Sequence, residues 1–308
     1  MSRPEHIDRP KMSEIRYRGA IDTVIPEKYD SVELKMDGMY GFMDISKGQW
    51  TIKSRTGNIV ADGVWPRDSD DFVLIGEWMA RSHWAKRMGD IEENSFYPFD
   101  ILYSKMRGRD ETRDLRDKDL YTRRRYLRQA IRMLDDSRYN VDEELRDKLP
   151  LIIPVHVSDK SEWKELWEDF IISYGYEGLV FKSSYSKFDD KNAWARMKKE
   201  IEMDYICVGF EPANDSSKYK GQVGAVKGTL IDKDVIVECG GLTDAQRQDY
   251  TDNAEKYKGR IFTAKGNDWY PSGSIRHPKF REWRDDKTHY ECSYTQVPED
   301  IRDGVSES

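Results

Sequence analysis

Short stretches in which apolar and polar residues alternate fill much of the first two thirds of the chain. An alternation of period two is typical of a β-strand with one buried face, and glycines or charged residues bound most of these stretches. We therefore expect strands over five ranges: 31–36, 40–45, 50–54, 72–79 and 96–103. A sixth and a seventh short strand are expected at 177–182 and 194–198.

Two stretches place their apolar residues at helical spacing instead. The first, 122–133, predicts a basic helix. The second follows Asp159 and Glu162, whose spacing is that of a capping box. Its large apolar residues recur three or four positions apart: Trp163, Leu166, Trp167, Phe170 and Tyr174. We interpret this stripe as the buried face of a helix.

After residue 200 the pattern changes to strands separated by glycines. We expect strands at 205–210, 223–231, 235–239 and 261–264, with a short helix at 243–250. Gly221, Gly224 and Gly228 punctuate one of these strands, as happens where a small barrel bends sharply. The sequence thus predicts an α+β protein of two domains, residues 1–202 and 203–308. A small β-barrel of the oligonucleotide-binding (OB) fold is the natural candidate for the second domain.

Composition limits the class of protein without naming a function. A length of 308 residues suffices for two domains with their own cores. The net charge of −7 argues against a general nucleic-acid coat, although a local basic groove is compatible with it. The three cysteines, Cys207, Cys239 and Cys292, are far apart and suggest neither a disulfide framework nor a zinc site. With 35% charged residues and no run of 18 apolar ones, we expect a soluble cytoplasmic protein that does not enter membranes.

Lys35 is the candidate for chemistry. It closes the strand-like stretch 31–36 and is followed at once by Asp37 and Gly38. A lysine fixed in this way can act as a nucleophile, although an exposed lysine before a turn is the simpler explanation of Lys-x-Asp-Gly alone. A free lysine has a pKa of about 10.4, so a nucleophilic lysine needs burial and nearby positive charge or metal to lower that pKa.

Further segments supply the groups that a covalently bound nucleotide would need. Glu77 closes the stretch 72–79, where it could bond a ribose hydroxyl, and Phe99 could stack on a purine. Glu177 and Lys182 stand at the two ends of one short strand and could provide a metal ligand and a phosphate contact.

Arg196 and Lys198 alternate on a second short strand, so both can reach one phosphate. Each residue alone is more simply structural. Their ordered occurrence together indicates a site.

These segments carry a resemblance to a known family. They read KMDG from Lys35, SRTG at 54–57, LIGEW at 74–78, YPFD at 97–100, EGLVFK at 177–182, WARMK at 194–198 and RDDK at 284–287. Together they resemble the ATP-dependent DNA ligases, in particular the small two-domain ligases of bacteriophages, within the covalent nucleotidyltransferase superfamily. The resemblance covers residues from about 30 to 290. It implies a nucleotidyltransferase (adenylation) domain of antiparallel sheets with flanking helices, followed by the OB-fold domain.

The resemblance also implies a reaction in three steps. Lys35 attacks the α-phosphate of ATP to give a lysyl-AMP, and the AMP passes to the 5′-phosphate at a nick. The 3′-hydroxyl then displaces the AMP and seals the strand. The implied cofactors are ATP and Mg²⁺, with Mn²⁺ possible, and the implied partner is nicked double-stranded DNA. We expect a monomer, in the host cytoplasm if the protein is viral.

Individual roles follow by position in the motifs. Glu33 would face the adenine amino group, while Glu77 and Phe99 would contact the ribose and the purine face. Arg55 would grip the nick phosphate or its adenylated form.

The α-phosphate would be surrounded by Lys182, Arg196 and Lys198, with Glu177 and Asp37 as metal ligands. In the second domain Arg284, Asp286 and Lys287 would close over the pyrophosphate.

Two departures from the family pattern stand out. The first motif usually continues to an arginine, but Tyr40 occupies that position here. The contact that this arginine makes must be lost, replaced or supplied by another residue. The fifth motif usually has two lysines, and here it reads Arg196 and Lys198, which keeps the charge.

A basic stretch is the candidate DNA-binding surface. Residues 105–128 hold ten Lys or Arg against five Asp or Glu. We hypothesise that Arg123, Arg124 and Arg125 follow the phosphate backbone. A solvated helix with internal ion pairs is an equally good interpretation of the mixed charges.

Other functions stay open at this point. An RNA ligase would generally lack the barrel and its RDDK motif, whereas a GTP-dependent mRNA-capping guanylyltransferase shares both, so SRTG favours a ligase. NAD-dependent ligases resemble the chain poorly. A non-catalytic nick-binding module is disfavoured because Lys35, Glu77, Glu177 and Lys198 are all present.

Overall fold

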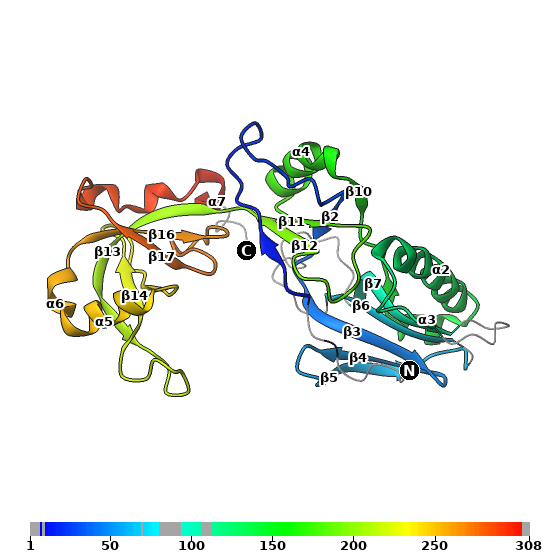
Figure 1. The fold of residues 1–308 in the computed structure, drawn as a ribbon. Helices are drawn as coiled ribbons and strands as arrows, with labels where there is room; N and C mark the ends of the chain where they lie inside the picture. The colour runs from blue at the N-terminus through cyan, green and yellow to red at the C-terminus, as the bar shows by residue number, and fades with distance from the viewer. Residues whose placement is uncertain (1–6, 8–9, 69, 80–93, 106–112, 304–308) are drawn as a thin grey trace. The chain divides into compact units, whose positions relative to one another are not determined.

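The computed structural model describes residues 7, 10–68, 70–79, 94–105 and 113–303 (Figure 1). The chain divides into two compact units, Met1–Lys198 and Lys199–Ser308. The division falls four residues before the boundary expected from the sequence. It precedes β13 (Ile201–Pro212), the first strand of the second unit.

The first unit contains two sheets. The smaller has the order β1-β12-β11-β2-β10, and all its pairings are antiparallel except that of β1 with β12. Its strands are β1 (Ser13–Glu14), β2 (Ser31–Lys35), β10 (Val157–Asp159), β11 (Gly178–Lys182) and β12 (Trp194–Lys198). The larger sheet has the order β5-β4-β3-β6-β7-β8, with β9 pairing to β7. Its strands are β3 (Met39–Ser46), β4 (Gln49–Ser54), β5 (Ile59–Val64), β6 (Asp71–Trp78), β7 (Ser95–Lys105), β8 (Arg113–Asp114) and β9 (Leu151–Ile152).

Alternation along β2 determines which face of the smaller sheet is apolar. Val32 and Leu34 pack in a core with Trp163 and Trp167. The helical stripe predicted from the sequence forms that cover, but as three consecutive pieces: η1 (Lys160–Glu162), α4 (Trp163–Leu166) and the π-helix η2 (Trp167–Ser173). The opposite face of the sheet carries the intervening polar residues of β2.

The larger sheet is covered on one face by α2 (Leu120–Tyr139). Phe72, Leu74 and Trp78 of β6 pack with Leu127 and other apolar residues of that helix. The helix begins at the cap Asp119, whose side chain accepts the Thr122 N–H at 2.7 Å, and ends before α3 (Glu143–Asp147). It starts two residues earlier and ends six residues later than the sequence pattern indicates.

The second unit is a five-stranded barrel. Its sheet has the order β15-β14-β13-β16-β17. The strands other than β13 are β14 (Val223–Thr229), β15 (Val237–Cys239), β16 (Ile261–Gly266) and β17 (Lys279–Trp283). Gly240, just after β15, accepts the Phe280 N–H at 2.8 Å, so the first and last strands meet. The OB-fold expectation is confirmed.

Short helices complete the second unit. They are α5 (Asp244–Asp252), α6 (Ala254–Tyr257), η3 (His289–Glu291), η4 (Tyr294–Gln296) and α7 (Glu299–Asp303). Gly228 is needed within β14, because a Cβ there would lie 2.7 Å from both Phe262 and Tyr205. Among the helices of the described part of the chain, none is long and apolar enough to span a membrane.

Candidate active site

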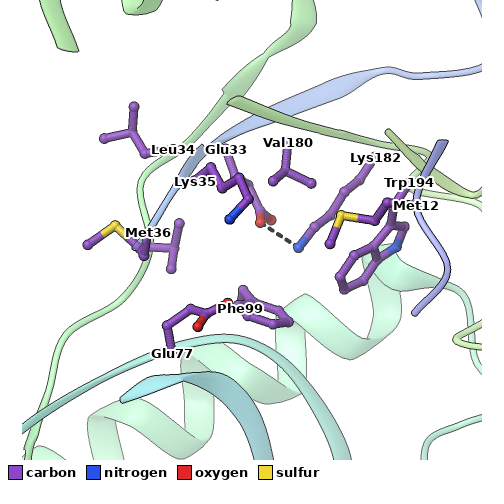
Figure 2. Close-up of a pocket in the computed structure, with 11 residues that line it drawn as sticks. Met12, Glu33, Leu34, Lys35, Met36, Glu77, Phe99, Val180, Lys182 and Trp194 are labelled. Carbon is purple, nitrogen blue, oxygen red and sulfur yellow. Dashed lines mark ion pairs between the residues drawn. The ribbon is translucent and has the colours of Figure 1, made fainter. Parts of the chain in front are cut away.

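Residues of both sheets of the first unit line one pocket (Figure 2). The smaller sheet contributes Glu33, Lys35, Lys182 and Trp194, and the larger contributes Glu77 from β6 and Phe99 from β7. Met12, Leu34, Met36, Val155 and Val180 complete the lining. The cavity is small, about 30 Å³, which is room for roughly two water molecules. A nucleotide therefore has to displace side chains that now fill the space.

Strand register brings Lys35 and Lys198 together. Gly178 of β11 pairs with Lys35 on one side and with Lys198 on the other. Glu177 comes just before this strand, and each of its carboxylate oxygens forms an ion pair with one of the two ammonium groups. The Lys35 and Glu177 side chains are each only 7% exposed. The position next to Glu177 must be glycine, because a Cβ on Gly178 would lie 2.1 Å from the Met197 carbonyl oxygen.

The trio has the electrostatics of a buried ion cluster. Burial alone would raise the pKa of Glu177, but Lys35 and Lys198 outweigh it and hold that pKa below its ordinary value. Burial lowers the pKa of Lys198, and the like charge of Lys35 lowers it further against the opposing effect of Glu177. Glu177 is thus ionised, and it holds two cations side by side.

A second ion cluster is centred on Glu33, which lines the pocket. Glu33 pairs with Lys182 through one oxygen and with Arg124 through the other, at 2.7 Å for the arginine. Burial would raise the pKa of Glu33, but the two cations hold it below its ordinary value. The Lys182 ammonium also lies 4.7 Å from the Phe99 ring centroid and 3.9 Å from that of Trp194. Figure 2 shows the three side chains together in the pocket.

The three cations expected around one α-phosphate have different partners in this structure, and their shared role stays a prediction. Lys182 pairs with Ser31 in the strand register, four residues before Lys35, and its ammonium reaches Glu33 instead. Arg196 forms an ion pair with Glu14 of β1, the strand beside it. Of the three predicted cations, Lys198 is the one that shares Glu177 with Lys35.

Glu77 and Tyr40 are neighbours on adjacent strands. The two residues pair directly between β3 and β6, and both are buried. The Tyr40 ring lies 6.4 Å from that of Phe99 and packs in a core with Phe42 and Ile75. Tyr40, which stands where the first motif usually has an arginine, therefore packs among apolar residues next to Glu77 and Phe99.

The acidic groups suit a magnesium ion that substrate and water also bind better than a metal that protein ligands alone enclose. Within the described ranges, no three His, Cys, Asp or Glu side chains are grouped closely enough to hold a metal. Glu177 is a hard oxygen donor at the mouth of β11, and Asp37 follows β2 as a half-buried residue. Mg²⁺ is commonly held by one or two carboxylates together with substrate phosphates and water. Glu177 fits that role, and Asp37 stays a prediction.

The three consecutive arginines have different environments, which corrects part of the DNA-binding hypothesis. Arg123 is wholly buried and makes a two-pronged ion pair with Asp100, at 2.8 and 2.9 Å. It cannot contact DNA, because its guanidinium faces the core. Arg124 pairs with the pocket residue Glu33, and Arg125 is exposed and stays a candidate. Of the surrounding basic stretch, residues 106–112 lie outside the described residues.

Arg55 lies in the tight turn between β4 and β5. Its side chain is exposed, and it is not among the residues that line the pocket. The turn is closed by hydrogen bonds from Gly57 to Ser54 and from Ser54 to Asn58. This position leaves Arg55 accessible to an external ligand.

The RDDK residues of the second unit border a separate cleft of about 370 Å³. Arg284 and Lys287 line it with Arg260 and His289. Arg284 makes a two-pronged pair with Asp286, at 2.8 and 2.6 Å, and this contact lowers the pKa of Asp286 to about 2. The cleft thus concentrates cationic side chains, as a site for an anion would.

Two pocket residues were missed from the sequence. Trp194 alternates with Arg196 and Lys198 along β12, so its place on the same face could have been inferred from period two. Arg124 reaches the pocket from a helix of the other sheet's layer, and nothing in the local pattern predicts that contact.

Comparisons with known proteins agree with this fold. Residues 57–199 match the family model described as the ATP dependent DNA ligase domain. The DNA ligase of Enterobacteria phage T3 is 27% identical over 135 residues, which are 42% of this chain and 38% of the phage protein. The chain thus matches about four tenths of the length of this relative.

Solved structures of similar fold extend the comparison. A structure named Pmar-Lig_PreS3 has a TM-score of 0.61 at 18% identity, over 83% of this chain and 63% of its own. A structure of a Lig E DNA ligase has a TM-score of 0.58 at 16% identity, over 90% of this chain and all of its own. The fold is therefore that of the nucleotidyltransferase and OB domains of ligases. The match of residues 57–199 to the ATP dependent DNA ligase domain and the phage relative bear out the resemblance inferred from the motifs.

Proposed function

We propose that this protein is an ATP-dependent DNA ligase that seals nicks in duplex DNA through a lysyl-AMP on Lys35. The observation that carries the proposal is the Lys35–Glu177–Lys198 ion cluster, whose Lys35 is buried and lines a pocket together with Glu77 and Phe99. An ordinary surface lysine before a turn would be exposed, whereas Lys35 is 7% exposed and fixed by a carboxylate.

In the proposed first step, neutral Lys35 attacks the α-phosphorus of ATP. An N–P bond forms, the P–O bond to the β-phosphate breaks, and pyrophosphate leaves with its electron pair. The attacking amine is neutral, so the ammonium group in the Lys35–Glu177 ion pair first gives its proton to solvent. ATP binding would have to separate this pair, and Lys198 would remain as a cation beside the reacting phosphate.

A divalent metal, when bound, supplies further neutralisation of phosphate charge. We propose Mg²⁺, with Mn²⁺ as a substitute, and Glu177 would hold it once ATP binding has released this carboxylate from Lys35 and Lys198. Glu77 and Phe99 would hold the ribose and the purine, and Arg55 would contact the nick.

The remaining two steps concern DNA. The AMP passes to the 5′-phosphate, and the 3′-hydroxyl displaces it to form the phosphodiester. Support for DNA as the substrate comes from relatives that are named DNA ligases. We propose a monomer that acts in the cytoplasm. A GTP-using guanylyltransferase and an RNA ligase are the other outcomes that the test distinguishes.

The test is the intact mass of the protein after incubation with Mg²⁺ and either ATP or GTP. We expect an AMP adduct with ATP that is absent in Lys35→Ala and retained in Lys148→Ala, an exposed lysine on the same unit. A GMP adduct would indicate a guanylyltransferase, and no adduct with either nucleotide would contradict the proposal. Nicked duplexes with DNA or RNA on either side of the nick then identify the substrate.

A further inference from the structure

Arg124 is not part of any motif that suggested the site, yet from helix α2 it contacts Glu33, which lines the pocket. Its guanidinium donates to Glu33 at 2.7 Å and to the Ser31 hydroxyl at 3.0 Å. The Arg124 side chain is 11% exposed and that of Glu33 is 3% exposed. A buried charge of this kind is costly unless it is paired, so the contact is a specific feature of the fold.

The two contacts of Arg124 hold one oxygen of the Glu33 carboxylate and link it to the Ser31 hydroxyl. The Ser31 hydroxyl donates to the Lys182 carbonyl at 3.2 Å, which leaves its lone pairs to accept from Arg124. One side of the planar guanidinium is thus anchored to the backbone pairing of β2 and β11, and the other side holds Glu33. Lys182 binds the second carboxylate oxygen, but an ammonium group is a point charge with rotatable donors and does not impose a plane.

The orientation of Glu33 matters because a carboxylate can distinguish a hydrogen-bond donor from an acceptor on the edge of a base. Adenine presents an amino donor where guanine presents a carbonyl acceptor. A carboxylate accepts from the amino group and repels the carbonyl oxygen, and it retains lone pairs after binding two cations. Discrimination of this kind depends on the angle at which the oxygen meets the base edge, because hydrogen bonds weaken steeply when misaligned.

We propose that Arg124 is a positioning residue for base selection: it orients the Glu33 carboxylate so that the pocket prefers adenine to guanine nucleotides. This inference rests on the proposed function for the identity of the ligand. It assigns no role in phosphoryl transfer to Arg124, which touches neither Lys35 nor Glu177 in the described contacts.

The test measures ATP and GTP dissociation constants by calorimetry in EDTA, where no transfer to Lys35 takes place. We expect Arg124→Lys to lose about tenfold of the preference for ATP, because the charge is kept but the planar contact is lost. Arg124→Gln should lose at least as much and should also lower the melting temperature. The matched control is Arg132→Gln, an exposed arginine on the same helix, which should keep the wild-type ratio.

A second measurement distinguishes a positioning role of Arg124 from a role as a structural counter-ion alone. If Arg124 acts through Glu33, then Arg124→Lys should change the ATP-to-GTP ratio much less in a Glu33→Gln background than alone. A folded Arg124→Lys protein with the wild-type ratio would overturn the proposal, as would equal effects in both backgrounds. A wild-type protein with no preference between ATP and GTP would overturn it too. Preferential ATP binding without a covalent adduct would instead contradict the proposed function alone.

Discussion

Three consecutive arginines of this protein have different environments. Arg123, Arg124 and Arg125 are consecutive on α2, and each helical residue turns the side chain by about 100°. One guanidinium therefore meets Asp100 in the core, the next meets Glu33 in the pocket, and the third faces solvent. A substitution of Arg123 should act on stability, since it leaves a buried Asp100 unpaired.

The buried Glu33 gives a prediction for pH. Its pKa is depressed in the folded protein, so its ion pairs contribute stability above the unfolded pKa of about 4.3, and this stability is lost as pH falls through the lower folded pKa. We expect Glu33→Gln to be less stable by about 3 kcal/mol at neutral pH, because two buried cations lose their partner. Below pH 4 the difference from wild type should shrink. Thermal unfolding between pH 3 and 7 measures both, and a difference that stays constant with pH would contradict the assignment.

At the scale of elements, strand β11 positions the residues of the Lys35–Glu177–Lys198 cluster. This five-residue strand is buried throughout and pairs with β2 and β12, which carry Lys35 and Lys198. Glu177 stands at its start, so a displacement of the strand would move the carboxylate away from both lysines. Gly178 permits the close approach of β12.

We accordingly predict that Gly178→Ala impairs both stability and catalysis. The added methyl group would meet the Met197 carbonyl oxygen and the Lys198 Cα, and overpacking of this kind costs about 1–3 kcal/mol. AMP-adduct formation should slow by more than the loss of folded protein explains. Gly175→Ala is the control: its φ of +71° is strained for alanine, but nothing lies within 4 Å of the added Cβ. Equal adduct rates in the two variants would contradict the role of β11.

At the scale of the whole molecule, a negative net charge coexists with a local group of cationic side chains. The formal net charge is −7, yet the second unit gathers Arg260, Arg284 and Lys287 around one cleft. Several of the cations are held by carboxylates, as Arg284 is by Asp286 and Lys287 by Glu291 at 3.0 Å. These pairs keep the side chains ordered before an anion arrives.

Under the proposed function, this cleft should matter for the first step and little for the last. We expect the Arg284→Ala and Lys287→Ala double variant to form the AMP adduct about 100-fold more slowly, because the charge of the leaving pyrophosphate is less well neutralised. Sealing of a nick that already carries AMP should change much less. Arg281→Ala, on β17 but outside the cleft, serves as the control. An equal loss in both steps would show that the cleft acts on DNA or on folding instead.

Much of this architecture was predictable from local pattern. Period-two alternation located β2, β3, β4, β6 and β7 to within one or two residues at each end, because each buries one or both faces in a core. Six strands were missed, and four of them, β1, β8, β9 and β10, have only two or three residues, too few to show an alternation. β5 is largely exposed and lacks alternation, and β17 is short with a mostly exposed, charged sequence.

The sequence by itself determined the residue types and their order: a lysine before a turn, a carboxylate at a strand start, alternating cations and a distant RDDK. These follow from covalent order and from the two-residue period of strands, which are local properties. Only the tertiary structure decided which charges meet. Register placed Lys35 and Lys198 on either side of Gly178, and it placed Lys182 opposite Ser31, from which its ammonium reaches Glu33. Helix packing brought Arg124 to Glu33 and buried Arg123. Pairing between distant segments depends on how sheets and helices pack, and no local pattern contains that information.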